Sequence, residues 1–178
     1  FADHVYLPLS ADGPLDWVVE QHPVRLIGLD STIPGEHGGQ LDYCQLDWLN
    51  AQLSSRPDVP TMIILHHPPF MSGIGHMDHK PFGNAVELER VIARHPQVER
   101  LLCGHLHRPM QRRFGGSLTC VCPGTSHQIV LDLDEAAPAN FNLEPAGYVL
   151  HRWHPQEGLV SHNAVFGEYE GPYPFYDA

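Results

Sequence analysis

The chain has 178 residues, 42% of them hydrophobic, and a formal net charge of −11 from 21 acidic and 10 basic residues. That length and composition favour one globular domain, and no apolar run approaches the ~18 residues that a membrane span needs. An acidic surface repels nucleic-acid polymers and anionic membranes, so we expect neither as a partner. A phosphate-bearing substrate would need a local positive feature, such as a bound metal ion.

The cysteines favour a reducing compartment. Cys44 lies in a helical pattern, the other three lie in apolar strand-like runs, and no two form a CxxC pair. Reduced cysteine commonly packs as a small hydrophobic side chain, so we expect structural thiols in a cytoplasmic protein. A zinc site through Cys120 and Cys122 is the alternative, although alternate positions on one strand are poor geometry for a tetrahedral site.

The first part of the chain alternates strands and helices. Apolar residues recur at helical spacing from Leu41 to Leu53, and Asn84 with Glu87 resembles the start of a second helix with a capping box. The expected elements, in chain order, are a hairpin (17–20 and 23–31), a helix (41–53), a strand (61–65), a long loop (70–83), a helix from Asn84 and a strand (98–103). Strand, helix and strand in succession favour parallel pairing.

Beyond residue 103 the pattern becomes one of strands. A hairpin turns at Gly115-Gly116, and a closing strand pair is expected over 147–153 and 159–166. Residues 135–145 indicate a surface excursion, and the aromatic tail contains prolines and glycines that disfavour regular structure.

Two groups of histidines each follow an apolar strand. The sequence HHPP at 66–69 follows the first strand, and GHLH at 104–107 follows the second. Open α/β sheets keep their binding groups at such strand ends, so we predict that His66, His105 and His107 are metal ligands. Three neutral imidazoles suffice for a catalytic zinc, whereas a two-metal phosphoryl site normally adds carboxylates, and no fitting carboxylate lies close in sequence.

The roles of the other histidines stay open at this point. His67 should point away from its neighbour His66, which makes it a group behind the ligands or a substrate contact. His127 follows a Pro-Gly-Thr turn, where both a pocket wall and the surface are compatible. His76 and Asp78 share the long loop, and we expect them to be solvated rather than to line a pocket.

Four motifs together resemble a known family. They are ILHHPP at 64–69, GHMD at 75–78, LCGHLH at 102–107 and PGTSHQ at 123–128. The sequence is similar to the C-terminal portion of a calcineurin-like metallophosphoesterase, in the branch of class III cyclic nucleotide phosphodiesterases and bacterial glycerophosphodiesterases.

The resemblance implies a fold and a set of roles. The α/β fold would be the C-terminal part of a four-layer αββα sandwich, followed by a C-terminal β extension. His66 and His105 would ligate the second metal ion and His107 the first, while His127 would stand near the substrate. With His67 as a substrate contact, we expect the substrate pocket to include His67 and His127.

The sequence also departs from the family pattern. The motifs Asp-x-His, Gly-Asp and Gly-Asn-His have no match, and Asp3-His4 is adjacent rather than spaced. The carboxylate ligands and the general acid would therefore lie upstream of Phe1. We expect residues 1–134 to be the C-terminal half of the metallophosphoesterase domain, and residues 135–178 to be an extension that caps the pocket or makes a dimer contact.

The implied function is hydrolysis of a small phosphodiester, of the cyclic nucleotide or glycerophosphodiester type. Two metal ions (iron, manganese, zinc or cobalt) would generate a hydroxide that attacks phosphorus in the intact protein. The 178 residues alone are expected to be inactive, with partial or no metal occupancy, and to form a homo-oligomer.

Two alternatives remain. One is a non-catalytic module that oligomerises or binds metal weakly. The other is a mononuclear zinc hydrolase that uses His66, His105 and His107 alone.

Overall fold

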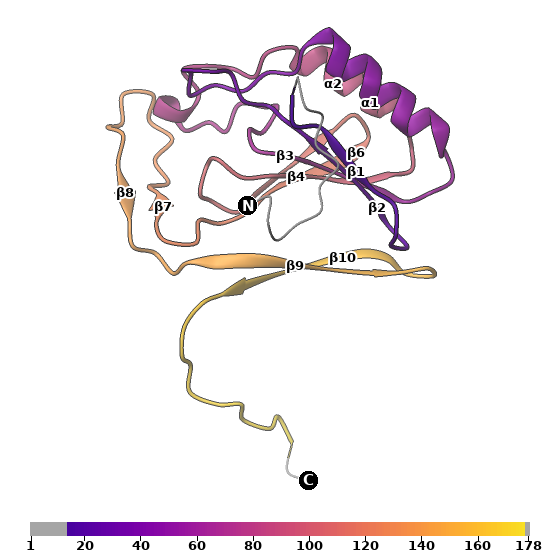
Figure 1. Ribbon diagram of the computed structural model, residues 1–178. Coiled ribbons are helices and arrows are strands. Elements are labelled where there is room, and N and C mark those ends of the chain that lie inside the picture. Colours follow the sequence, from indigo (N-terminus) through magenta and orange to yellow (C-terminus); the bar gives the residue numbers. More distant parts are fainter. Residues whose placement is uncertain (1–13, 177–178) are drawn as a thin grey trace.

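The computed structural model of the protein describes residues 14–176 (Figure 1). Its centre is a six-stranded sheet with the strand order β1-β2-β3-β4-β6-β5. The strands are Trp17–Val19 (β1), Arg25–Leu29 (β2), Thr61–Leu65 (β3), Val98–Cys103 (β4), Met110–Phe114 (β5) and Ser117–Val121 (β6). β2, β3, β4 and β6 are parallel, while β1 and β5 are antiparallel to their neighbours. Both predicted hairpins and the predicted parallel pairing are confirmed.

Two helices, Tyr43–Ser55 (α1) and Ala85–Ala93 (α2), cover one face of this sheet (Figure 1). α1 begins with a complete capping box, in which Asp42 accepts from the Gln45 backbone N–H (2.8 Å) and Gln45 accepts from the Asp42 N–H (3.0 Å). The prediction of a capping box at the start of α2 is wrong. Asn84 has a left-handed backbone (φ 61°) and no capping bond. Its side-chain amide instead donates to the Leu41 carbonyl (2.8 Å), so it joins the two helix entries rather than capping one.

The hydrophobic core lies between the sheet and the two helices. Ile27, Ile63 and Leu101, on three neighbouring strands, are completely buried and belong to one cluster with Leu49 and Leu53 of α1. Full burial of such a side chain contributes about 1.5–3 kcal/mol. This packing fixes β2, β3 and β4 in register, and it thereby aligns the carboxyl ends from which the predicted site residues emerge.

The opposite face of the sheet is covered by a β-hairpin. Its strands, Gly147–His154 (β9) and Gly158–Val165 (β10), lie across the sheet from the helices (Figure 1) and confirm the predicted closing pair. A cavity of about 480 Å³ separates the hairpin from the sheet, and Ile64, Leu102 and Val149 are among its lining residues. The sheet face away from the helices is therefore only partly filled within residues 14–176.

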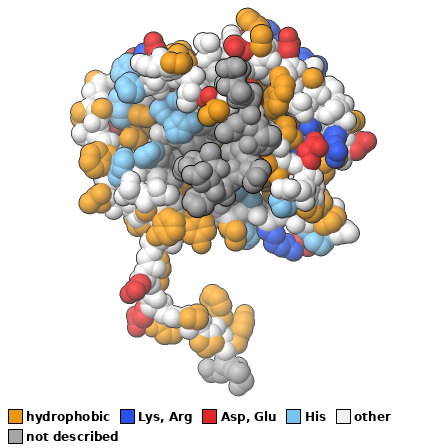
Figure 2. Space-filling model, viewed as in Figure 1, with side chains coloured by type: hydrophobic (Ala, Val, Ile, Leu, Met, Phe, Trp, Pro, Cys, Tyr) orange, Lys and Arg blue, Asp and Glu red, His pale blue; other side chains and the backbone are white. Residues whose placement is uncertain are grey.

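A short ribbon and a tail complete the structure. Gln128–Ile129 (β7) pairs with Phe141–Asn142 (β8), and one turn of 3-10 helix, Gly75–Met77 (η1), lies in the long loop. The proposed domain boundary after residue 134 lies between β7 and β8 and stays a prediction. The tail after β10 extends away from the rest of the structure (Figure 1) and carries exposed aromatic side chains (Figure 2).

All four cysteines are free thiols, and burial raises the pKa of the Cys103 and Cys120 thiols. Such thiols stay protonated and unreactive at neutral pH, as expected of structural cysteines. Cys44 and Cys122 are exposed, so the expectation of packed thiols is wrong for these two. Within residues 14–176, no helix combines the length and the apolar character needed to cross a lipid bilayer.

Candidate metal centre

The two histidine groups lie at neighbouring strand ends, as predicted. β3 leads into His66 and β4 leads into Gly104, whose N–H donates to the His66 carbonyl (3.0 Å). Leu106 is buried in the core at 2% exposure, whereas His105 and His107 on either side of it have left-handed backbones (φ 65° and 47°). Residues other than glycine seldom adopt this conformation, and it clusters at functional sites.

Three imidazoles form the candidate metal site. One ligand nitrogen each from His66, His67 and His105 lies within 4.8 Å of the other two. Their ring centroids are 4.6–5.2 Å apart, and Figure 2 shows histidine side chains gathered on this face of the molecule. No Asp or Glu belongs to this group in the described part of the chain. His67, although adjacent to His66, is thus brought to the same centre.

The hydroxyl of a buried serine contacts both the ring and the backbone of His67. Ser31 Oγ lies 3.0 Å from His67 Nδ1 and also accepts the His67 backbone N–H (3.2 Å). Because Nδ1 is occupied, Nε2 is the nitrogen left for a ligand or substrate. The sequence reasoning missed Ser31, although its position just after β2, next to β3 in the sheet, was a usable signal.

Gly39 makes room for the His67 ring. A Cβ atom at Gly39 would lie 2.3 Å from His67 Cβ and 2.4 Å from Cγ, so only glycine permits this approach. The site therefore depends on a loop before α1 that carries no chemical group of its own.

Desolvation and neighbouring imidazoles favour the neutral form of the three histidines. His67 is buried, His105 is half-buried and His66 is exposed by its surface area. Desolvation lowers the pKa of each, and a nearby imidazole lowers it further, His107 for His66 and His66 for His67. The pKa of His105 falls to about 4, through burial first and then through His67 and His66. Neutral imidazoles offer free lone pairs at neutral pH, which is the state that a metal ion requires.

His107 and His127 form a second pair beside the first group. Their ring centroids are 4.5 Å apart, and Ser126 Oγ lies 2.9 Å from His127 Nδ1. Among residues 14–176, no hydrogen-bond partner reaches the buried Nδ1 of His107. An orphaned buried imidazole nitrogen together with three neutral imidazoles fits the ligand chemistry of divalent transition metals.

The long loop differs from expectation. Both ring nitrogens of His76 are buried and have no partner in the described part of the chain. Asp78 accepts bonds from Ser72 N–H, Ser72 Oγ and Gly73 N–H (2.7–2.9 Å). The expectation of solvated side chains is therefore wrong for these two residues. Asp78 organises the loop because the loop folds back on itself, which residue type alone does not reveal.

Curated relatives of the chain are phosphodiesterases. The probable glycerophosphodiester phosphodiesterase GpdQ of Arcobacter nitrofigilis is 40% identical over 164 residues, covering 92% of this chain and 60% of the relative. GpdQ of Enterobacter lignolyticus is 30% identical, covering 88% and 56%, respectively. The 3',5'-cyclic adenosine monophosphate phosphodiesterase CpdA of Escherichia coli K12 is 34% identical, covering 67% and 46%. A scan against protein-family models finds no match.

Two solved structures share the fold. GAP50, described as the anchor in the inner membrane complex of Plasmodium, aligns with a TM-score of 0.55 at 16% identity, covering 80% of this chain and 45% of that chain. A dimetal phosphatase from Danio rerio aligns with a TM-score of 0.50 at 14% identity, covering 86% and 61%. At these identities the likeness shows the fold alone, and it confirms the α/β metallophosphoesterase type.

Homologues among the calcineurin-like phosphodiesterases thus cover most of the chain, which confirms the resemblance read from the motifs. The chain in turn spans between 46% and 60% of the length of these three relatives.

Proposed function

We propose that this chain is part of a metal-dependent phosphodiesterase that acts on small diesters of the cyclic nucleotide or glycerophosphodiester type. The observation that carries the proposal is the convergence of His66, His67 and His105, three imidazoles whose pKa values are lowered by desolvation, at the carboxyl ends of two parallel strands. The activities named for the homologues support the same reaction class.

We propose that His66 and His105 hold one metal ion and that His107 holds a second, with the remaining ligands supplied from outside residues 14–176. When bound, such ions activate water and neutralise phosphoryl oxygens. The orphaned nitrogen of His107 and the absence of carboxylates from the imidazole group within the described residues both support this division. The metals are proposed to be iron, manganese, zinc or cobalt, which imidazole and carboxylate ligands accept.

His67 and His127 are proposed to line the substrate pocket. Ser31 orients His67, and Ser126 contacts His127, so a serine hydroxyl fixes the position of each imidazole. Both rings lie beside a proposed metal ligand, His67 next to His105 and His127 next to His107. The geometry therefore supports contact with a diester bound between them.

The test compares, in the full-length protein that contains this chain, His105→Ala with His162→Ala, a substitution of an exposed histidine on β10. We expect His105→Ala to lower hydrolysis of bis(p-nitrophenyl) phosphate by about 100-fold or more, because loss of an outer contact alone costs roughly 10–100-fold. His162→Ala should leave the rate unchanged. Undiminished hydrolysis in His105→Ala would overturn the proposal.

Metal analysis separates the alternatives. Two ions per protein with turnover support the proposed enzyme, whereas one tightly bound zinc with activity supports a mononuclear hydrolase. Neither metal nor turnover would favour a non-catalytic, oligomerising module. Exposed apolar side chains on the hairpin and tail, including Leu150 at 58% and Phe175 at 97% exposure, are the observation that favours this module.

We further propose that the protein is a homo-oligomer in the cytoplasm. The same exposed side chains on the hairpin and tail support self-association, and the free thiols support a reducing compartment. Light scattering at working concentration tests the first point, since a monomer would contradict it. Fractionation of cells tests the second.

A further inference from the structure

A row of three rings leads outward from the proposed metal centre. The ring centroids of His107 and His127 lie 4.5 Å apart, and those of His127 and Phe141 lie 5.0 Å apart in a T-shaped arrangement. Phe141 is nevertheless 65% exposed. An aromatic side chain is thus presented to solvent beside the pocket that we propose for the diester.

The two-stranded ribbon of β7 and β8, which includes Phe141 and directly follows His127, is too short to be stable without further contacts. β7 and β8 pair through only two residues each, Gln128 with Asn142 and Ile129 with Phe141. An isolated two-stranded hairpin is marginally stable at best even at greater length. The connection between the strands adds little packing, because Leu131 and Leu133 are exposed. Other contacts must therefore fix the ring row.

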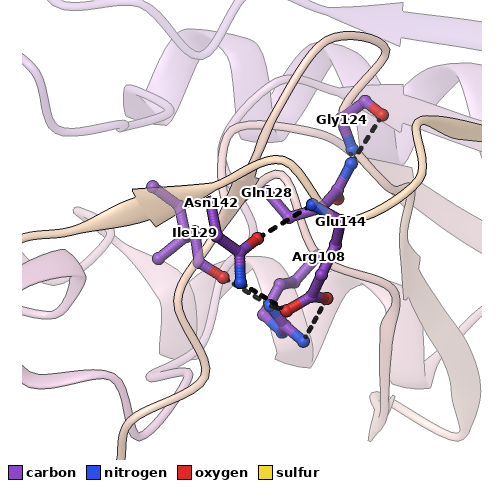
Figure 3. A network of polar contacts seen from close by, with 6 residues as sticks. All are labelled: Arg108, Gly124, Gln128, Ile129, Asn142 and Glu144. Carbon is purple, nitrogen blue, oxygen red and sulfur yellow. Dashed lines mark hydrogen bonds and ion pairs between the residues drawn. The ribbon is translucent and has the colours of Figure 1, made fainter.

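An ion pair supplies part of this support. The guanidinium of Arg108, only 14% exposed, donates to the Ile129 carbonyl and to both carboxylate oxygens of Glu144 (3.0 and 3.4 Å; Figure 3). Asn142 donates to Glu144 (2.6 Å) and accepts the Glu144 backbone N–H (3.2 Å). Arg108 follows His107 directly in the chain, so the pair joins the loop of a proposed ligand to both strands of the ribbon.

The other end of the ribbon is fixed by a buried amide. Gln128 accepts the Gly124 N–H (3.0 Å) and donates to the Gly124 carbonyl (2.9 Å), which closes the turn that presents His127 (Figure 3). These buried contacts fix the turn that precedes His127. Glu144 is exposed, and its pKa is held below the usual value by the Asn142 amide and the Arg108 guanidinium.

We propose that the Arg108–Glu144 pair is a positioning device for the substrate pocket: it holds β7 and β8 so that Phe141 packs on His127 and His127 on His107. Phe141 then contacts the organic group of the diester, and the pair determines how tightly that group is bound. This inference rests on the proposed function. It adds Phe141 to the residues proposed to line the substrate pocket. Neither Arg108 nor Glu144 touches the reacting atoms in this arrangement.

The kinetic test replaces Glu144 in the full-length protein that contains this chain, because Glu144 lies far in sequence from every proposed ligand. Glu144→Ala removes the acceptor of Arg108 and Asn142, and Glu144→Gln keeps the shape and one acceptor oxygen. Glu157→Ala is the control, because it removes an ion pair with Arg152 in which both side chains are exposed. For bis(p-nitrophenyl) phosphate we expect Glu144→Ala to raise KM about fivefold with kcat changed less than about twofold. Glu144→Gln should recover most of the loss.

A purely structural role for the pair would lower the unfolding temperature without this separation of KM from kcat, and would overturn the inference. So would a KM for Glu144→Ala equal to that of Glu157→Ala. The kinetic result thus decides whether the pair acts on binding of the substrate.

A second measurement needs no activity. In the metal-free protein, the NMR chemical shifts of the His127 ring protons report whether the Phe141 ring lies against the His127 ring. Phe141→Leu removes that ring and sets the reference displacement, and Glu144→Ala should displace the His127 signals in the same direction, whereas Glu157→Ala should not. If the full-length protein proves inactive, the proposed function fails while this experiment still decides the positioning role. Unmoved His127 signals in Glu144→Ala would overturn it.

Discussion

The hydrogen bonds between Ser31 and His67 allow a quantitative test of how the centre is held. Ser31→Ala removes the acceptor of the His67 backbone N–H and the partner of His67 Nδ1, at a position where Ser31 is 1% and His67 is 7% exposed. An orphaned buried polar group costs about 1–3 kcal/mol. With the backbone N–H fully orphaned and the ring nitrogen partly so, we expect a loss of about 2–3 kcal/mol in the free energy of unfolding.

Ser117→Ala is the matched control. Ser117 is also buried, but its hydroxyl has no hydrogen-bond partner among the described residues, so its removal should change the unfolding free energy by less than about 0.5 kcal/mol. The assay is urea denaturation of both metal-free variants and the wild type, with the midpoint converted through a common m value. If Ser31→Ala is no less stable than Ser117→Ala, the hydrogen bonds from Ser31 do not hold His67 and the argument fails.

Three further predictions concern the same site and its surroundings. Gly39→Ala should displace His67 and lower metal affinity about 10–100-fold by titration calorimetry, while Gly38→Ala, whose Cβ would meet only Lys80 at 3.2 Å, should not. Removing metal with a chelator should lower the unfolding temperature, because the ions bind the native site; an unchanged temperature would contradict this. Burial lowers the pKa of His95 below its usual 6.5, so the unfolded chain binds more protons and stability falls as pH drops below about 6.5. His95→Gln should reduce this fall in denaturation midpoints between pH 7.5 and 5, and an identical fall would refute it.

Local patterns in the sequence predicted the helices, the main strands and the histidines of the candidate metal centre. Apolar periodicity predicted both helices and the main strands, since the side chains that must be buried recur at the period of the element. HHPP and GHLH could be placed at neighbouring strand ends because two parallel strands joined by a crossover present their carboxyl ends together. The family resemblance then followed from these same residues.

Only the tertiary structure decided which groups support that centre. The contacts of Ser31 with His67 and of Arg108 with Glu144 each join residues 36 apart in the chain, and Asn84 reaches Leu41 across 43 residues. Such pairs depend on how loops pack at the edge of the sheet, whereas capping and periodicity rules extend over about four residues. The sequence by itself therefore determined that imidazoles converge at the strand ends, and the packing of distant loops decided what orients them.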